Sequence, residues 1–139
     1  MLNDAEFPPH SGISVLADQG VPVSLQFASG ISDFGGYFTY IEPFTVIAYD
    51  ALNNDIGEAH SAFSSNYTSS GNPTNEFMGL SGIGLIDHVK LVGNPHGGSF
   101  TADDIGFSAP SSVTPEAPAV GYLALGLVLL AAARARKES

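Results

Sequence analysis

The chain of 139 residues has no cysteine and few basic residues, and each shortage excludes a class of chemistry. Without cysteine it can form no disulfide and perform no thiol chemistry, a composition compatible with an exported bacterial protein. There are four Lys and Arg residues and fourteen Asp and Glu residues, which gives a net charge of −10. Because so acidic a chain repels phosphate backbones, we expect no nucleic-acid partner.

Motifs typical of enzymes are also missing from the sequence. The four histidines are scattered, with none of the short spacings that zinc sites use. There is no Gly-x-Ser-x-Gly elbow and no Walker-type phosphate loop, for which Lys90 would be the only base before residue 134. We therefore predict a protein that is not an enzyme and needs no cofactor. The alternative left open is a hydrolase with two carboxylates facing each other across a cleft.

The first residues do not read as a signal peptide. Exported proteins begin with a basic stretch and an apolar core, and Met1 to His10 contains neither. These opening residues look like the interior of a domain. We therefore expect the sequence to be a fragment, or a misassigned start, of a longer precursor. The alternative is a chain that inserts into the membrane by its tail alone.

The last part of the chain has three segments in a fixed order. Residues 109–118 are rich in proline, serine and threonine, which favours an extended linker. Residues 119–133 contain no charge, and residues 134–139 hold three of the four basic residues. This order predicts one C-terminal transmembrane helix followed by a basic cytoplasmic tail. The basic residues that flank the membrane are Arg134, Arg136 and Lys137.

Residues 119–133 are short for a membrane span. A helix of this length covers about 22 Å, whereas the hydrocarbon core is about 30 Å thick. Bilayer thinning and snorkelling of the flanking arginines can close the difference. Because Lys and Arg next to a span stay on the cytoplasmic side, we expect the body on the outer side of the membrane. The alternative is a buried C-terminal helix of a soluble domain.

Directly before the apolar run the chain reads Pro115-Glu116-Ala117-Pro118. Pro-Glu-Pro followed by a short transmembrane segment and an Arg-rich end resembles the PEP-CTERM sorting signal of Gram-negative and related bacteria. The resemblance assigns the sorting motif to Pro115, Glu116 and Pro118, although Ala117 is inserted where the family has Pro-Glu-Pro. It implies recognition by exosortase, a membrane-embedded cysteine protease, and an association with extracellular polysaccharide.

The body of the chain, residues 1–108, reads as β throughout and is long enough for one domain. Apolar and polar residues alternate in residues 23–28, and β-favouring residues dominate further short segments. We predict an exposed loop at residues 61–75 and a turn at the Gly-rich residues 79–84. Repeated short strands indicate an antiparallel β-sandwich or jelly roll, and their order also resembles the lectin-like bodies common in PEP-CTERM proteins. The predicted strands are residues 23–28, 34–41, 44–50, 56–63, 76–80, 85–92 and 99–108.

Two adjacent carboxylates interrupt the last predicted strand. Alternation places Asp103 and Asp104 on opposite faces, so whichever face is inward carries a carboxylate. A buried carboxylate needs hydrogen bonds or a cation, and Ca²⁺ binds carboxylate oxygens. In lectin-like sandwiches a structural calcium often joins the first and last strands. The resemblance therefore implies a calcium site formed by Asp103 and Asp104 together with Glu6 or Asp4. The alternative is a carboxylate at a strand end that bonds to a turn.

The aromatic residues of neighbouring strands distinguish two functions. If they fill the core, the chain is an exported cell-envelope or extracellular-matrix protein, and the function that its sequence indicates is sorting and anchoring through the C-terminal signal. If several are exposed on one sheet face, they can stack on sugar rings, and the chain is a carbohydrate-binding module anchored at the cell surface. We favour the first function, with the body at the cell surface or extracellular after processing. The aromatic residues are Tyr37, Phe38, Tyr40, Phe44 and Tyr49.

Overall fold

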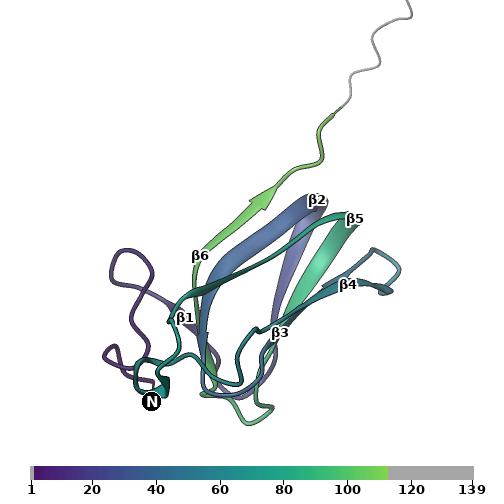
Figure 1. Ribbon diagram of the computed structural model, residues 1–139. Helices are drawn as coiled ribbons and strands as arrows, with labels where there is room; N and C mark the ends of the chain where they lie inside the picture. The colour runs from purple at the N-terminus through teal and green to yellow at the C-terminus, as the bar shows by residue number, and fades with distance from the viewer. Residues whose placement is uncertain (1, 113–139) are drawn as a thin grey trace, which may run out of the picture.

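The computed structural model describes residues 2–112, which form one antiparallel sheet of six strands (Figure 1). The order across the sheet is β1-β6-β2-β5-β3-β4, and every pairing is antiparallel. The prediction of an all-β antiparallel fold is confirmed for these residues. The elements are β1 (Leu16–Ala17), β2 (Val23–Tyr40), β3 (Thr45–Tyr49), β4 (Asp55–His60), the 3₁₀ turn η1 (Thr68–Ser70), β5 (Glu76–Val92) and β6 (Phe100–Ser108).

Two long strands, β2 and β5, lie side by side and organise the sheet (Figure 1). Their register shifts between Gln26 and Ile31, and again between Ile31 and Asp33, because each strand carries extra residues there. Extra residues of this kind bend a strand and increase its twist. Several glycines in this region adopt a positive φ, which other residues reach only with strain. They are Gly30 (68°), Gly82 (67°) and Gly84 (106°).

On either side of the bend, different strands extend the long pair. β6 pairs with the second part of β2 and carries β1 at its edge, whereas β3 pairs with the second part of β5 and carries β4. The two halves face each other. Phe44, just before β3, has its ring centroid 4.9 Å from that of Phe38 on β2 and 4.6 Å from that of Phe100 on β6. The arrangement is therefore sandwich-like, although all six strands belong to one hydrogen-bonded sheet.

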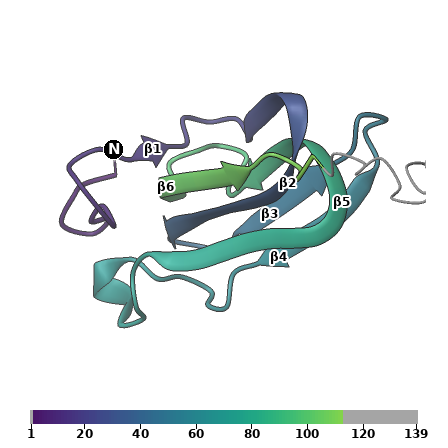
Figure 2. The ribbon, with the colours of Figure 1, turned by 90° about the horizontal axis from the view of Figure 1, so that it is seen from above.

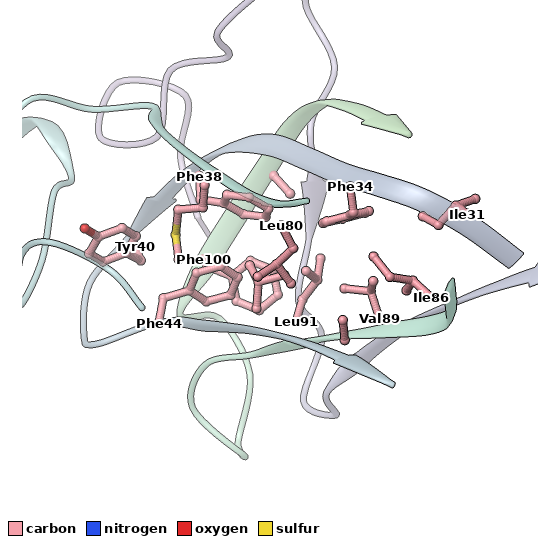
Figure 3. Packing of buried hydrophobic residues seen from close by; sticks show 14 residues of the cluster. Ile31, Phe34, Phe38, Tyr40, Phe44, Leu80, Ile86, Val89, Leu91 and Phe100 are labelled. Atoms are coloured by element: carbon pink, nitrogen blue, oxygen red, sulfur yellow. The ribbon is translucent and has the colours of Figure 1, made fainter. Parts of the chain in front are cut away.

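The core lies between these halves (Figure 3). Burying a large apolar side chain contributes roughly 1.5–3 kcal/mol, so these residues are the main source of stability. The cluster is Ile31, Phe34, Phe38, Tyr40, Phe44, Val46, Ala48, Met78, Leu80, Ile86, Val89, Leu91, Phe100 and Ala102.

A buried amide fastens the loop between β4 and β5 to the sheet. Asn66 is fully buried; its Nδ2 donates to the carbonyl of Phe38 at 2.9 Å, and its Oδ1 accepts from the N–H of Tyr40 at 2.6 Å. Asn66 thus continues the hydrogen bonding of β2 beyond the point where β5 begins.

The Tyr40 hydroxyl donates to the Glu76 carboxylate, and burial together with this bond raises the pKa of Tyr40 to about 12. The predicted loop at residues 61–75 is present but is not wholly exposed.

A buried carboxylate holds the connection between β5 and β6. Asp18, only 5% exposed, accepts hydrogen bonds from the N–H and Oγ of Ser99 at 2.8 and 2.9 Å and from the N–H of Phe100 at 3.1 Å. These donors replace the water that a carboxylate loses on burial. Asp18 thereby ties the segment after β1 to the start of β6.

Some predicted strand boundaries are wrong. Residues 23–28 and 34–41 belong to one strand, β2, and residues 76–80 and 85–92 belong to one strand, β5. The Gly-rich residues 79–84 therefore form no turn between strands. Glycine inside a strand marks a bulge as readily as a turn, and only the pairing of β5 with β2 distinguishes the two.

The predicted transmembrane helix of residues 119–133 and the tail of residues 134–139 lie outside the described residues, as does the linker beyond Ser112. The same holds for the sorting motif Pro115, Glu116 and Pro118 and for the basic residues Arg134, Arg136 and Lys137. Within residues 2–112, no helix is long and apolar enough to cross a membrane.

Candidate functional site

The outer face of β5, β2 and β6 presents three rows of paired residues. Paired residues of adjacent strands point to the same side of a sheet, so each row runs across the three strands on one face. This face is directed away from the core, because Phe34 and Leu80, which lie between the rows, are buried on the other side. The rows are Ser81–Asp33–Ser108, Gly79–Gly35–Gly106 and Phe77–Tyr37–Asp103.

The middle row has no side chains and forms the floor of a groove of about 480 Å³. The polar row borders one side of the groove through Asp33 and the two serines. Phe77 and Asp104 border the other side. Phe34, Leu80 and Phe107, which pair with one another between the outer rows, also line the groove. The groove therefore combines exposed backbone, the ring of Phe77 and two carboxylates.

The ring of Phe77 lies over part of the glycine row. A Cβ on Gly35 would come within 2.8 Å of Cζ of Phe77, and a Cβ on Gly79 within 3.1 Å of its Cε1. Glycine at these two positions lets the ring settle against the backbone. The other side of the ring stays in solvent, since Phe77 is 61% exposed. The ring of Tyr37 meets it edge-on, with centroids 5.4 Å apart.

The N-terminal segment covers the rest of this face. The ring of His10 stacks on Tyr37 with centroids 3.5 Å apart, and its Nδ1 lies 2.7 Å from Oδ2 of Asp104. The N–H of Ser11 donates to Asp103 at 2.8 Å, and its Oγ donates to Asp104 at 2.6 Å. The hydrogen bonds from His10, and next those from Ser11, hold the pKa of Asp104 below its ordinary value of 3.8.

The alternation expected through Asp103 and Asp104 is interrupted. The register of β6 against β2 shifts between Gly35 and Tyr37, and Asp104 has a φ of 47°. Both carboxylates therefore reach the N-terminal segment, and neither lies in the core. The carboxylates bond to protein donors, as in the predicted alternative, but they lie inside β6 and not at a strand end, and the donors belong to the N-terminal segment.

Glu6, which with Asp4 was one of the two further calcium ligands predicted, bonds to η1. Its carboxylate accepts from the N–H of Ser69 at 2.9 Å and from Ser69 Oγ at 2.5 Å, and these bonds lower its pKa. Figure 2 shows the N-terminal segment and the loop carrying η1 at one end of the molecule. Within residues 2–112, no three His, Cys, Asp or Glu side chains are grouped so that they could hold a metal ion. Calcium binding stays a prediction, which an unchanged melting temperature at millimolar Ca²⁺ would contradict.

The aromatic residues divide between core and surface. Phe38, Tyr40 and Phe44 fill the core, whereas Tyr37 and Tyr49 lie on the outer faces of different halves. Tyr49 stacks on His88 with centroids 4.8 Å apart and carries Lys90 Nζ at 4.8 Å from its centroid. The aromatic neighbour of Tyr37 on its own face is Phe77.

The glycine row and Phe77 were not predicted as a site. Gly35, Gly79 and Gly106 are 44 and 27 residues apart in sequence, and nothing in their local pattern aligns them. The available signal was glycine inside strand-like segments, which often marks a close approach to the backbone. Only the register of three strands brings these glycines into one line.

The chain was compared with protein-family models, with curated proteins and with solved structures, and none of the three comparisons gave a match.

Proposed function

We propose that this is a non-catalytic, exported protein of the cell envelope or extracellular matrix, anchored and sorted by its C-terminal segments. The observation that supports this proposal is the order of three segments: the proline-rich linker, the uncharged residues 119–133 and the basic residues 134–139. An exosortase-type protease would recognise Pro115, Glu116 and Pro118, with the body on the outer side of the cytoplasmic membrane. After processing, the lectin-like body would remain at the cell surface or be released.

The arrangement of the body is compatible with display on a stalk. All members of the core cluster come from residues 31–102, before the linker. Figure 1 shows β6 leading toward residue 112 at the end of the molecule opposite the first residues. A chain continuing from there can hold the domain away from a surface.

Membrane retention can be tested with one charge. At the centre of a span, aspartate makes membrane insertion less favourable than leucine does by about 3–4 kcal/mol. Leu127→Asp should therefore move the full chain from the membrane fraction to a soluble fraction. Leu52→Asp is the matched control, because Leu52 is 83% exposed in a loop of the body. Mass determination of the C-terminus then reports processing. Intact Ser139 in a soluble cytoplasmic pool of the unsubstituted chain would contradict the proposal.

A second candidate function is a carbohydrate-binding module on the same anchor. The observation that favours it is the groove with the exposed ring of Phe77 beside Tyr37 on a single sheet face. Apolar ring faces of sugars stack on aromatic side chains, and polysaccharide is a partner already implied by the resemblance to sorted surface proteins.

A further inference from the structure

We propose that the glycine-floored groove binds an uncharged pyranose chain over a length of about two sugar units. This inference rests on the second candidate function and names its site and ligand class. The groove lies on the outer face of β5, β2 and β6, between the polar row and the side formed by Phe77 and Asp104.

The open part of the floor is at Gly106. A Cβ added there would meet no atom within 4 Å, and Gly106 is not among the glycines at positive φ. Neither backbone conformation nor packing against a neighbour therefore requires glycine at this position, in contrast to Gly35 and Gly79, which lie under Phe77. Glycine here leaves the backbone of β6 open to a ligand.

The walls match the two kinds of surface that a pyranose presents. The exposed ring of Phe77 offers an apolar face for the axial C–H groups of a sugar. Asp33 offers carboxylate oxygens as acceptors for hydroxyl groups, and Asp104, whose two oxygens already bond to His10 and Ser11, offers the second lone pair of each oxygen. Asp33 accepts a hydrogen bond from Ser32 Oγ on its Oδ2 at 2.6 Å, and within residues 2–112 its Oδ1 has no donor.

The charge of the groove selects against anionic sugars. Its lining holds two carboxylates and no basic residue. Lys90, the only Lys or Arg before residue 134, lies over Tyr49 on the other half of the sheet. A uronate or a sulfated sugar would meet repulsion without a counter-charge, whereas an uncharged sugar keeps its hydroxyl bonds to the carboxylates.

Phe77 covers Gly79 and Gly35, so a ligand laid across the strands rests on the Phe77 ring and on the open backbone at Gly106. Adjacent strands lie about 4.8 Å apart, so this path from Gly79 to Gly106 spans roughly 10 Å across three strands. It corresponds to about two pyranose units. Farther along the face, the N-terminal segment covers Tyr37 and limits the width of the groove.

The test uses the full chain in a zwitterionic detergent that contains no sugar, with binding measured by calorimetry. We expect cellohexaose or maltohexaose to bind and hexagalacturonate not to bind. Gly106→Val fills the floor with a residue that suits a strand and should weaken binding at least about tenfold. Phe77→Leu keeps an apolar cover over the two glycines without an aromatic face and should weaken binding up to about tenfold.

Ser24→Val is the matched control, because Ser24 is an exposed strand residue on the outer face of the other half. The affinity of this variant for the hexaoses should stay within about twofold of that of the unsubstituted chain. Circular dichroism confirms folding of each variant. Binding that is unaffected by both groove variants would overturn the groove assignment, although the module function would stand. If only a glucosamine hexamer bound, and salt abolished that binding, the groove assignment would be overturned, because the carboxylates would then merely attract a cationic sugar. Absence of binding by both uncharged hexaoses would overturn the module function as well, and would leave the anchoring proposal to the fractionation experiment.

Discussion

At the scale of single residues, buried polar groups connect loops to the sheet. Asn66 and Asp18 each satisfy backbone groups at the end of a strand, and both are almost inaccessible to water. A buried N–H or carbonyl that loses its partner costs about 1–3 kcal/mol. These two positions should therefore be more sensitive to substitution than their polar character suggests.

We expect Asn66→Ala to lower the free energy of unfolding by about 2–4 kcal/mol, because the N–H of Tyr40 and the carbonyl of Phe38 would both lose their partner. Urea unfolding followed by circular dichroism measures the change. Ser64→Ala, an exposed position in the same loop, is the control and should change the stability by less than about 0.5 kcal/mol. Equal stability of the two variants would contradict the role assigned to Asn66.

The contact between His10 and Asp104 predicts a pH dependence. Because the folded pKa of Asp104 is lowered from 3.8, its contribution to docking of the N-terminal segment is complete above that value and is lost as pH falls through the folded pKa. Carboxyl NMR should show Asp104 titrating below 3.8 in the unsubstituted chain and closer to 3.8 in His10→Ala. In His96→Ala, which removes an exposed ring from another loop, the titration of Asp104 should not move.

At the scale of elements, the irregular region of β2 and β5 determines how the sheet folds over. The extra residues of both strands coincide there with glycines at positive φ. Regular strands of this length would continue as a twisted ribbon without a sharp bend, and the two halves could not face each other across a core. The bend is therefore as important for the fold as the apolar residues that it brings together.

We expect Gly30→Ala to destabilise the domain by about 1–3 kcal/mol, because alanine at a φ of 68° is strained and its Cβ would lie 2.8 Å from Cγ of Leu85. Gly106→Ala, in an open strand position, should change the stability by less than about 0.5 kcal/mol. Chemical denaturation of both variants makes the comparison. The prediction fails if the two substitutions are equally tolerated.

At the scale of the whole molecule, a folded domain precedes the sequence features that suggest export. Every residue of the core cluster lies between residues 31 and 102, and the domain encloses its own core (Figure 3). The membrane hypothesis requires that residues 119–133 contribute nothing to this core.

A chain ending at Ser112 should therefore melt at the same temperature as the full chain, because the core cluster is complete without the residues that follow. Differential scanning calorimetry of both chains in the same detergent measures this. A clear fall in the melting temperature of the shorter chain would mean that the apolar run packs against protein. In that case both the anchor and the exosortase partner would have to be abandoned.

The sequence by itself determined the all-β class, the positions of most strands and the absence of thiol chemistry. These follow from alternation, β-favouring residues and composition, which are local properties. It also predicted that one of Asp103 and Asp104 would face the core, which is wrong because the shifted register of β6 interrupts the alternation. A register shift depends on the partner strand and has no local signature.

Only the tertiary structure decided that β2 and β5 are continuous, that Asn66 and Asp18 are buried, and that three distant glycines form one floor. Each of these depends on which strands pair and in which register, a choice made by the packing of the whole core. The order of residues 109–139 is a property of the sequence alone, and the proposal for anchoring rests on it. The proposal for glycan binding rests on strand register, since no single strand contains the groove.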